Sequence, residues 1–408
     1  MHAAIGDQKH AHKAYAGRMR AYIVGGYVRD RLLGVTPADR DWVVVGETPE
    51  SMLAQGFKLA GKGFPVFLHP ATGEVYALAR TARENGRRHA GRTVYAAPDV
   101  TLEEDLARRD FTINAMAMGP DGALVDPFGG EADLKVGTLR HVGPGFEEDP
   151  LRVLRMARFA ARYGFSAAPE TLGVVSTLVR HGAMDSLVAE RVWAELIKAL
   201  SEDHCEVFFS SLRRWGVLSH VFPEIDRMFP CRETADGNAA CAKTPRFLDS
   251  LRAITGLSDD VLARFGVVVR GLSVGDIESF CERWAAPVRY RRFGIVCARF
   301  CSAVQGAFDL DASRVLGLFE GVGAFKRPED MERLVLVCQA DAQGQSQPDG
   351  RSYPQADYLG RLLRAASDVS SDSVLQSGVT GEEFGRSLRA LRIQAVEEAI
   401  RSYGRATE

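Results

Sequence analysis

The sequence predicts an α+β protein, in which a small mixed sheet with helices precedes a long all-helical region. Short runs rich in β-forming residues alternate with turns between Tyr22 and about Leu139. These runs are YIV, WVVV, PVFL, EVYALA and ALV. After about Glu147 the apolar residues recur at intervals of three and four, as on one face of a helix. Segments with this spacing are DPLRVLRMARFAARYGF, ERVWAELIKAL and CEVFFSSLRRWGVLSHVF.

Composition narrows the class of protein. The chain has 408 residues, 46% hydrophobic and 25% charged, which predicts a soluble globular protein of about two to four domains. No apolar run could span a bilayer and the first twenty residues lack the apolar core of a secretory signal, so we expect a cytoplasmic protein. Since 51 Lys and Arg balance 53 Asp and Glu, any RNA-binding surface must be a local arginine patch. Seven cysteines without a CxxC pair predict reduced, buried thiols.

The first strand leads into a glycine pair. Residues 1–18 predict a polar extension outside the fold, and Met19 is a possible alternative start. In YIVGGYVRD, Gly25 and Gly26 would let backbone N–H groups and Arg29 meet a triphosphate. The alternative is a tight strand-to-helix turn in which Arg29 only pairs with Asp30. The stretch is not a Walker A loop, because Gly-Lys-Ser/Thr is missing, and it is not a Rossmann fingerprint, because the third glycine is absent at the needed spacing.

Two aspartates begin the next strand. In DRDWVVV, Asp39 and Asp41 would point to one face, with Arg40 opposite. Two carboxylates on one face repel each other unless a cation lies between them, and Mg²⁺ suits such oxygen ligands and can bridge nucleotide phosphates. The alternative is a solvated turn at a strand entrance.

Later motifs add specificity. The glycine pair, VRD, a short helix closed by Gly34 and the DxD strand are followed by RRDFTINAMA, DPFGGEADL, EDPLRVLRMARFAARYGF and ERVWAELIKAL. Over residues 19 to about 225 this order resembles the DNA-polymerase-β-like nucleotidyltransferases. Within them it is similar to the class II tRNA nucleotidyltransferases (CCA-adding enzymes) and bacterial poly(A) polymerases. The resemblance implies a nucleotidyltransferase head at 19–140, a helical neck at 141–225 and a helical body at 226–408.

The EDPLR segment suggests how a base is chosen. Asp149 and Arg152 lie one helical turn apart and could present an acceptor and a donor fork to one planar base. Cytosine and adenine offer an amine beside a ring acceptor, whereas uracil and guanine place a carbonyl where the amine would be. The resemblance likewise implies a protein template for CTP and ATP. The alternative is that Asp149 caps the helix, Pro150 is its first residue and Arg152 is solvated.

Further residues are assigned to the nucleotide site. Arg155, Arg158 and Arg162 share a helical face, and Arg155 is a candidate nucleotide ligand. The resemblance adds Arg109 of RRD as a nucleotide-binding residue. Asp110 could orient Arg109 or complete the acidic site, and Glu74 is a rival for the second role. Residues 80–105 predict a mobile loop, which the resemblance links to switching from C to A addition; the alternative is an inert connection.

The C-terminal region departs from the related proteins. FPVFLHP, YAAPDVTLEEDL and RHVGPGFEEDPLRVLR are similar to the proteobacterial CCA-adding type, which commonly carries a C-terminal HD phosphohydrolase domain. No histidine follows His220, and an HD site needs several His ligands. We therefore expect no metal-dependent phosphohydrolase activity, and a degenerate HD-like body that could serve as a platform for tRNA through Arg289, Arg291 and Arg292.

The resemblance implies addition of CCA to tRNA 3′ ends from CTP and ATP with release of pyrophosphate. Asp39 and Asp41 would be catalytic and hold Mg²⁺. The nucleotide-binding residues would be Gly26, Arg29, Arg109, Asp149, Arg152 and Arg155. Alternatives are a poly(A) polymerase, a CC-only or A-only enzyme, and a catalytically silent RNA-binding protein.

Overall fold

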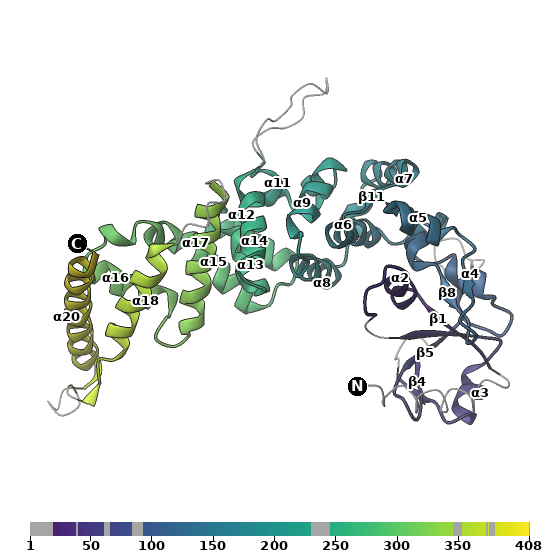
Figure 1. Ribbon diagram of the computed structural model, residues 1–408, viewed down its shortest axis with the longest axis horizontal. Helices are drawn as coiled ribbons and strands as arrows, with labels where there is room; N and C mark the ends of the chain where they lie inside the picture. The colour runs from purple at the N-terminus through teal and green to yellow at the C-terminus, as the bar shows by residue number, and fades with distance from the viewer. Residues whose placement is uncertain are drawn as a thin grey trace, which may run out of the picture. The chain divides into compact units, whose positions relative to one another are not determined.

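Figure 1 shows the computed structural model, which describes residues 19–37, 40–60, 66–83, 93–229, 245–345, 353–372, 374 and 380–407. The chain forms two compact units, Met1–Ala183 and Met184–Glu408. Their division falls inside the expected neck, so the expected limits of head, neck and body stay predictions. No helix within the described ranges is long and apolar enough to cross a membrane.

The N-terminal unit is built on a seven-stranded mixed sheet with the order β3-β4-β5-β2-β1-β8-β9. Only the pair β2 and β5 is parallel; the other neighbours are antiparallel. The strands are β1 (Arg20–Val24), β2 (Asp41–Val45), β3 (Lys58–Leu59), β4 (Val66–Leu68), β5 (Val75–Leu78), β8 (Ala117–Met118) and β9 (Leu124–Val125). The five β-rich runs of the sequence thus all contain strands, as predicted.

The two faces of this sheet bury different side chains, because successive residues of a strand point to opposite sides. Trp42 and Val44 of β2 pack with Tyr76, and the rings of Trp42 and Tyr76 stack with centroids 5.2 Å apart. Val43 and Val45 belong to a second cluster on the other face. Both faces are therefore apolar along β2, and the strand is held in the middle of the sheet.

Short elements surround the sheet. The helices of this unit are α2 (Gly26–Leu32), α3 (Pro49–Ala54), α4 (Leu102–Leu106), α5 (Gly130–Val136), α6 (Leu151–Tyr163) and α7 (Pro169–Arg180), with 3₁₀ turns η1 (Thr112–Asn114) and η2 (Pro144–Glu148). Strands β10 (Thr138–Leu139) and β11 (Ser166–Ala167) form a parallel pair. Gly34 has a φ of +73° after α2, which confirms the short helix closed by that glycine.

The expected mobile loop at 80–105 is only partly a loop. Its flanks pair as an antiparallel hairpin of β6 (Thr81–Arg83) and β7 (Thr93–Tyr95), and α4 occupies Leu102–Leu106. These elements contain many charged and few apolar residues, so the hydrophobic pattern of the sequence did not indicate them. Residues 84–92 lie outside the described residues, so a role of this segment in switching stays a prediction.

The second unit is helical. It contains η3 (Ala183–Ser186, which begins one residue earlier), α8 (Ala189–Leu200), α9 (Cys205–Arg214), α10 (Leu218–Val221), α11 (Pro223–Asp226), α12 (Arg246–Thr255), α13 (Val261–Val269), α14 (Val274–Arg283), α15 (Val288–Gln305), η4 (Ala307–Asp309), α16 (Ala312–Val322), α17 (Pro328–Gln345), α18 (Pro354–Ser367) and α20 (Gly381–Thr407). Figure 1 shows α12, α13, α15 and α17 gathered in one bundle.

Close helix packing explains one difference from expectation. The stretch ADAQGQSQPDGRSYPQ, which begins at Ala340, is rich in residues that favour loops, yet α17 continues to Gln345. A Cβ at Gly344 would lie 2.8 Å from the backbone nitrogen of Ser250, so glycine allows α17 to approach α12. Tertiary packing therefore overrides the weak helix propensity of this stretch. The five cysteines in the described ranges are buried and free, as predicted; Cys231 and Cys241 lie outside those ranges.

Candidate active site

The glycine turn and the DxD strand meet at one end of the sheet. Antiparallel pairing of β1 and β2 places Val24 beside Asp41, so Gly25 and Gly26 follow directly where Asp41 begins β2. Gly25 has a φ of +70°, a conformation that favours glycine, and its N–H donates to the Met116 carbonyl at 3.2 Å. Asp41 is exposed. Its predicted partner Asp39 lies outside the described residues.

Glu74 does not join Asp41. The parallel register of β2 and β5 sets Val75 beside Asp41, and alternation along the strand sends Glu74 to the opposite face. Glu74 instead pairs with Arg40 at 3.5 Å. The geometry therefore gives no support to Glu74 as the third acidic residue.

Asp110 is the centre of a buried polar cluster. It is 7% exposed and accepts hydrogen bonds from the Phe111 N–H at 2.9 Å, Asn114 Nδ2 at 2.9 Å and Arg155 Nε at 2.9 Å. Burial alone would raise the pKa of Asp110, but the charge of Arg155 and these hydrogen bonds outweigh it and lower the pKa. Asp110 thus orients Arg155 rather than Arg109, and both of its oxygens are already engaged.

Arg109 lies against the glycine turn. Its Nη2 pairs with Asp105 Oδ2 at 3.3 Å and its Nη1 donates to the Asn114 carbonyl at 3.5 Å. A Cβ at Gly25 would lie 2.7 Å from Arg109 Nη1, so the missing side chain makes room for this guanidinium. Arg109 Nε is buried and has no hydrogen-bond partner within the described part of the chain. A role of Arg109 in binding the nucleotide stays a prediction.

The predicted base-reading pair lies at the start of α6. Asp149 Oδ1 accepts a hydrogen bond from the Leu151 N–H at 3.3 Å, but α6 begins at Leu151 with Pro150 at the N-cap position, so Asp149 lies one position before the cap that the alternative assigned to it. Arg152 is not simply solvated: its Nη1 and Nη2 donate to the carbonyls of Arg109 and Arg108 at 3.1 and 2.6 Å. Burial lowers the pKa of Arg152, and Asp110 and Asp149 oppose that shift. Two of its five N–H groups are used, which fixes the plane of the fork.

Arg29 lies inside the unit rather than at its surface. It is 5% exposed, and its Nε donates to Asp30 Oδ1 at 2.9 Å while its Nη1 donates to Asn114 Oδ1 at 2.6 Å. Its guanidinium lies 5.3 and 5.0 Å from the ring centroids of Phe159 and Tyr163. The pairing with Asp30 considered as an alternative is therefore present, and a direct phosphate contact of Arg29 stays a prediction.

The arginine stripe of α6 divides by exposure. Arg158 is buried, with its guanidinium 4.6 Å from the centroid of the Phe159 ring. Arg155 and Arg162 are partly exposed, with 31% and 39% of their side chains accessible. Arg158 therefore packs against the Phe159 ring. Part of the Arg155 side chain is accessible, which a nucleotide ligand requires.

Residues not singled out from the sequence hold the cluster together. Asn114 joins Arg29 to Asp110, and the Tyr163 hydroxyl donates to Asp30 at 3.0 Å. Burial raises the pKa of Tyr163 to about 12, so the phenol keeps the proton that it donates. Asn114 stands four residues after Asp110 within RRDFTINAMA, and this spacing was its only signal.

The DPFGG motif fixes the RRD segment in place. Asp126 accepts from the N–H groups of Gly130 and Glu131 at 2.7 and 2.9 Å, which caps α5. A Cβ at Gly130 would lie 2.2 Å from the Thr112 carbonyl oxygen, so only glycine permits this approach. Thr112 Oγ1 in turn donates to Asp133 at 2.7 Å. Helix α5 is thereby locked to η1, which carries Asn114.

The metal site can be tested only in part. Within the described ranges no three His, Cys, Asp or Glu side chains gather as a metal cluster, and Asp39 is not among those residues. The donor that is described suits a hard cation, because Asp41 is an exposed carboxylate residue that begins β2 beside the Gly25-Gly26 turn.

Comparisons with known proteins agree with this architecture. Residues 21–140 match the family described as "Poly A polymerase head domain", and residues 164–229 match "Probable RNA and SrmB- binding site of polymerase A". Solved structures share the fold. A CCA-adding enzyme in apo form II has a TM-score of 0.69 at 23% identity, covering 98% of this chain and 94% of that one. The Thermotoga maritima CCA-adding enzyme complexed with tRNA has a TM-score of 0.64 at 22% identity, covering 96% and 92%.

Sequence relatives are closer. The multifunctional CCA protein of Methylococcus capsulatus is 46% identical over 401 residues, covering 93% of this chain and 94% of the relative. That of Nitrosococcus oceani is 44% identical, covering 94% and 99%. Identity at this level over nearly the whole length extends through both units. The chain therefore belongs to the multifunctional CCA protein family of tRNA nucleotidyltransferases.

Proposed function

We propose that this protein adds CCA to tRNA 3′ ends from CTP and ATP, releases pyrophosphate, and works in the cytoplasm, where such substrates would meet it. The observation that carries the proposal is the meeting of the Gly25-Gly26 turn with Asp41 at one end of the sheet. This chain is similar over almost its full length to relatives that are named multifunctional CCA proteins. The solved structures that share the fold include complexes of CCA-adding enzymes with ATP and with CTP.

Asp39 and Asp41 are proposed as the catalytic carboxylates and the ligands of Mg²⁺. Magnesium, when bound, would neutralise charge on the phosphates of the incoming nucleotide. Asp41 is the first residue of β2, a central strand of the sheet, so its backbone is held in position before substrate binds. A ligand on a fixed backbone needs less reorganisation as charge develops on the reacting oxygens.

The nucleotide is proposed to lie between the glycine turn and α6. Gly26 offers its backbone to the phosphates, and Arg109 and Arg155 supply positive charge from the two sides of the Asp110 cluster. Arg29, which donates a hydrogen bond to Asn114, is proposed to support this site from the interior of the unit. Asp105 and Asp110 hold the guanidinium groups in place, which lowers the entropy lost when phosphate binds.

Asp149 and Arg152 are proposed to read the base. The carbonyls of Arg108 and Arg109 hold Arg152 in one plane, and three of its N–H groups are left for other acceptors. A base with an amine beside a ring acceptor can pair with this carboxylate and fork, whereas uracil or guanine would set a carbonyl against the carboxylate. The template is therefore amino acid side chains rather than nucleic acid.

We also propose that the C-terminal unit has no metal-dependent phosphohydrolase activity. Support comes from the sequence, in which no histidine follows His220. Hydrolysis of 2′,3′-cyclic nucleotides that depends on added Mn²⁺, Ni²⁺ or Co²⁺ would overturn this proposal.

The transferase proposal is tested by extending a tRNA transcript that lacks its 3′-terminal CCA. Products are resolved at single-nucleotide length with CTP, ATP or both. Growth by CCA that stops there supports the proposal, whereas no growth, or an A ladder, contradicts it.

A further inference from the structure

Asn114 joins the VRD and RRD motifs. It is the last residue of η1, and 7% of it is exposed. Its side-chain Oδ1 accepts a hydrogen bond from Arg29 Nη1 at 2.6 Å, and its Nδ2 donates to Asp110 Oδ1 at 2.9 Å. Its backbone carbonyl accepts from Arg109 Nη1 at 3.5 Å. One uncharged residue therefore contacts three charged residues that belong to two separate motifs of the sequence.

Helix α6 is connected to both side-chain partners of Asn114. Arg155 of this helix donates from Nε to Asp110 Oδ2 at 2.9 Å. Tyr163, at the end of the helix, has its ring centroid 5.0 Å from the guanidinium carbon of Arg29. The contacts that leave α6 at Arg155 therefore return to it at Tyr163. This closed set of contacts, the polar ring, consists of Arg29, Asn114, Asp110, Arg155 and Tyr163.

The two partners of Asn114 require an amide between them. A guanidinium only donates hydrogen bonds, and an ionised carboxylate only accepts them. A side chain that joins Arg29 to Asp110 must therefore offer an acceptor to one and a donor to the other, which asparagine does without adding a charge. The pKa of Asp110 is lowered, so this carboxyl is ionised at neutral pH. An apolar side chain here would leave buried polar groups unpaired, and a second carboxylate would repel the first.

The polar ring connects the two sides of the proposed nucleotide site. Arg29 stands three residues after Gly26, whose backbone is proposed to meet the phosphates. Arg155 stands three residues after Arg152, which is proposed to read the base, and on the same helix. Loss of the Asn114 amide would remove the hydrogen-bonded link between these two sides. A nucleotide that must fit both at once would then bind more weakly, and its base would be read less strictly.

We propose that Asn114 is a positioning residue for nucleotide selection, which holds the base-reading end of α6 in register with the glycine turn by linking Asp110 to Arg29. In this role it needs no contact with the nucleotide. The role rests on the proposed function, because a change in nucleotide selection can be measured only in a protein that adds nucleotides. It deepens that function by assigning part of the selectivity to a buried side chain outside the base-reading pair.

The first test is Asn114→Leu, measured by single-turnover incorporation of CTP and of UTP on a tRNA transcript lacking CCA, over a range of nucleotide concentrations. Leucine has nearly the shape of asparagine but neither donates nor accepts a hydrogen bond. We expect the affinity for CTP to fall and incorporation of UTP relative to CTP to rise, each at least about fivefold.

Thr171→Val is the matched control for the loss of a buried hydrogen bond. Thr171 lies in α7, is fully buried and is not part of the polar ring, and its hydroxyl accepts from the His141 N–H at 3.0 Å. This variant should lower the temperature of unfolding but keep the wild-type affinity for CTP and the wild-type ratio of UTP to CTP.

A double exchange tests the link itself. Asn114→Asp alone sets two carboxylates against each other, and Asp110→Asn alone removes the charge that pairs with Arg155. Together the two substitutions restore one carboxylate and one amide between Arg29 and Arg155. The rescue should be partial, because the Phe111 N–H loses the acceptor oxygen of Asp110. We expect the double variant to be more selective than either single variant, whereas purely additive effects would overturn the proposal.

The outcomes separate this role of Asn114 from the proposed function. No extension of tRNA by the wild type would overturn both. Extension by the wild type, with unchanged affinity and ratio in Asn114→Leu, would overturn the role of Asn114 and leave the function standing. An equal change of ratio in Thr171→Val would make the effect a general consequence of lost stability, and would also overturn that role.

Discussion

Arg155 donates from Nε to Asp110 Oδ2 at 2.9 Å, with Nη2 2.8 Å from the same oxygen, across 45 residues of sequence. The pair ties α6, which carries the proposed base-reading residues, to the RRD segment. Because Asp110 is buried and Arg155 keeps an accessible edge, the contact both stabilises the unit and presents an arginine at the site.

This pair predicts a pH-dependent stability. The pKa of Asp110 in the folded chain lies below its ordinary value of 3.8, so the unfolded chain takes up the proton more readily. The stabilisation by Asp110 is complete above about pH 5 and is lost as the pH falls through 3.8 toward the folded pKa. Asp110→Asn should lower the free energy of unfolding by about 3 kcal/mol at pH 7.

Denaturant unfolding of the wild type and Asp110→Asn between pH 3 and pH 7 measures this difference. The gap between the two proteins should shrink at the acid end, because protonation removes the same charge from the wild type. A gap that stays constant across the range would show that Asp110 stabilises by packing rather than by charge.

The proposed metal ligands predict a loss of chemistry without a loss of fold. Asp41→Ala and Asp39→Ala should each reduce nucleotide transfer by at least about 10³-fold, since a ligand of the metal contributes several kcal/mol to the transition state. Asp41 is exposed, so thermal unfolding of Asp41→Ala should match the wild type. Glu103→Ala, an exposed acidic residue of α4, is the control. Full transfer by Asp41→Ala would reject the assignment.

The base-reading pair predicts a change in nucleotide choice. Asp149→Asn replaces one acceptor oxygen by a donor, so incorporation of UTP relative to CTP should rise about 10- to 100-fold, the equivalent of roughly 1–3 kcal/mol of discrimination. Single-turnover incorporation of each nucleotide on a tRNA transcript measures the ratio. Glu147→Gln, two residues earlier and exposed, should keep the wild-type ratio. An unchanged ratio in Asp149→Asn would leave Asp149 with only its structural hydrogen bond from the Leu151 N–H.

The glycine turn predicts a combined defect. Gly25→Ala adds a Cβ 2.7 Å from Arg109 Nη1 at a φ of +70°, so it should cost about 1–2 kcal/mol and also raise KM for the nucleotide. Gly122→Ala is the matched control, because its φ is +82° and nothing lies within 4 Å of the added carbon. It should show the loss of stability without the change in KM. Equal effects of both variants on KM would remove the role of Gly25 in placing Arg109.

The sequence predicted the strands and the helix closed by Gly34. It did not predict the contacts that the candidate site residues make. Periodicity and turn residues are local signals, and they were enough for β1, β2 and α6. The burial of Arg29 was not visible, because its partners Phe159 and Tyr163 lie over 100 residues away. The carbonyls that hold Arg152 were hidden for the same reason, since backbone acceptors leave no mark on the residue type.

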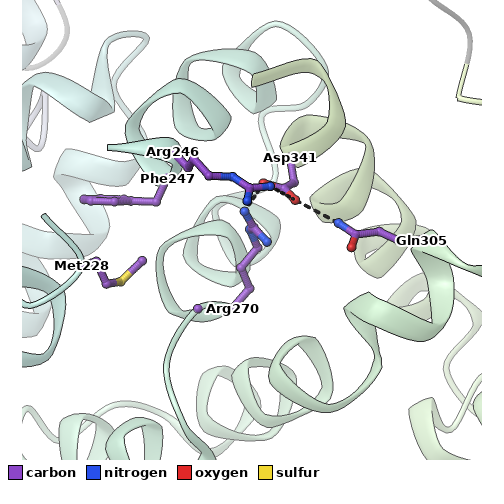
Figure 2. Close-up of a pocket in the computed structure, with 7 residues that line it drawn as sticks. Met228, Arg246, Phe247, Arg270, Gln305 and Asp341 are labelled. Atoms are coloured by element: carbon purple, nitrogen blue, oxygen red, sulfur yellow. Dashed lines mark hydrogen bonds and ion pairs between the residues drawn. The ribbon is translucent and has the colours of Figure 1, made fainter. Parts of the chain in front are cut away.

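The DPFGG motif shows another limit. From the sequence it served only as a family signature, and its physical role required the distance from Gly130 to the Thr112 carbonyl. The cavity lined by Met228, Arg246, Arg270, Gln305 and Asp341 (Figure 2) was likewise invisible, because its lining residues lie on five separate parts of the chain. Contacts between distant segments are what the structure adds.

The most direct measurement gives the purified protein Mg²⁺ and a tRNA transcript lacking CCA, with CTP alone, ATP alone, or both, and resolves products by single nucleotides. The account predicts two added residues with CTP alone and three, ending in A, with both. A product that stops at CC with both nucleotides would mean a CC-adding enzyme, and a ladder of A would mean a poly(A) polymerase. No extension under any condition would contradict the account outright.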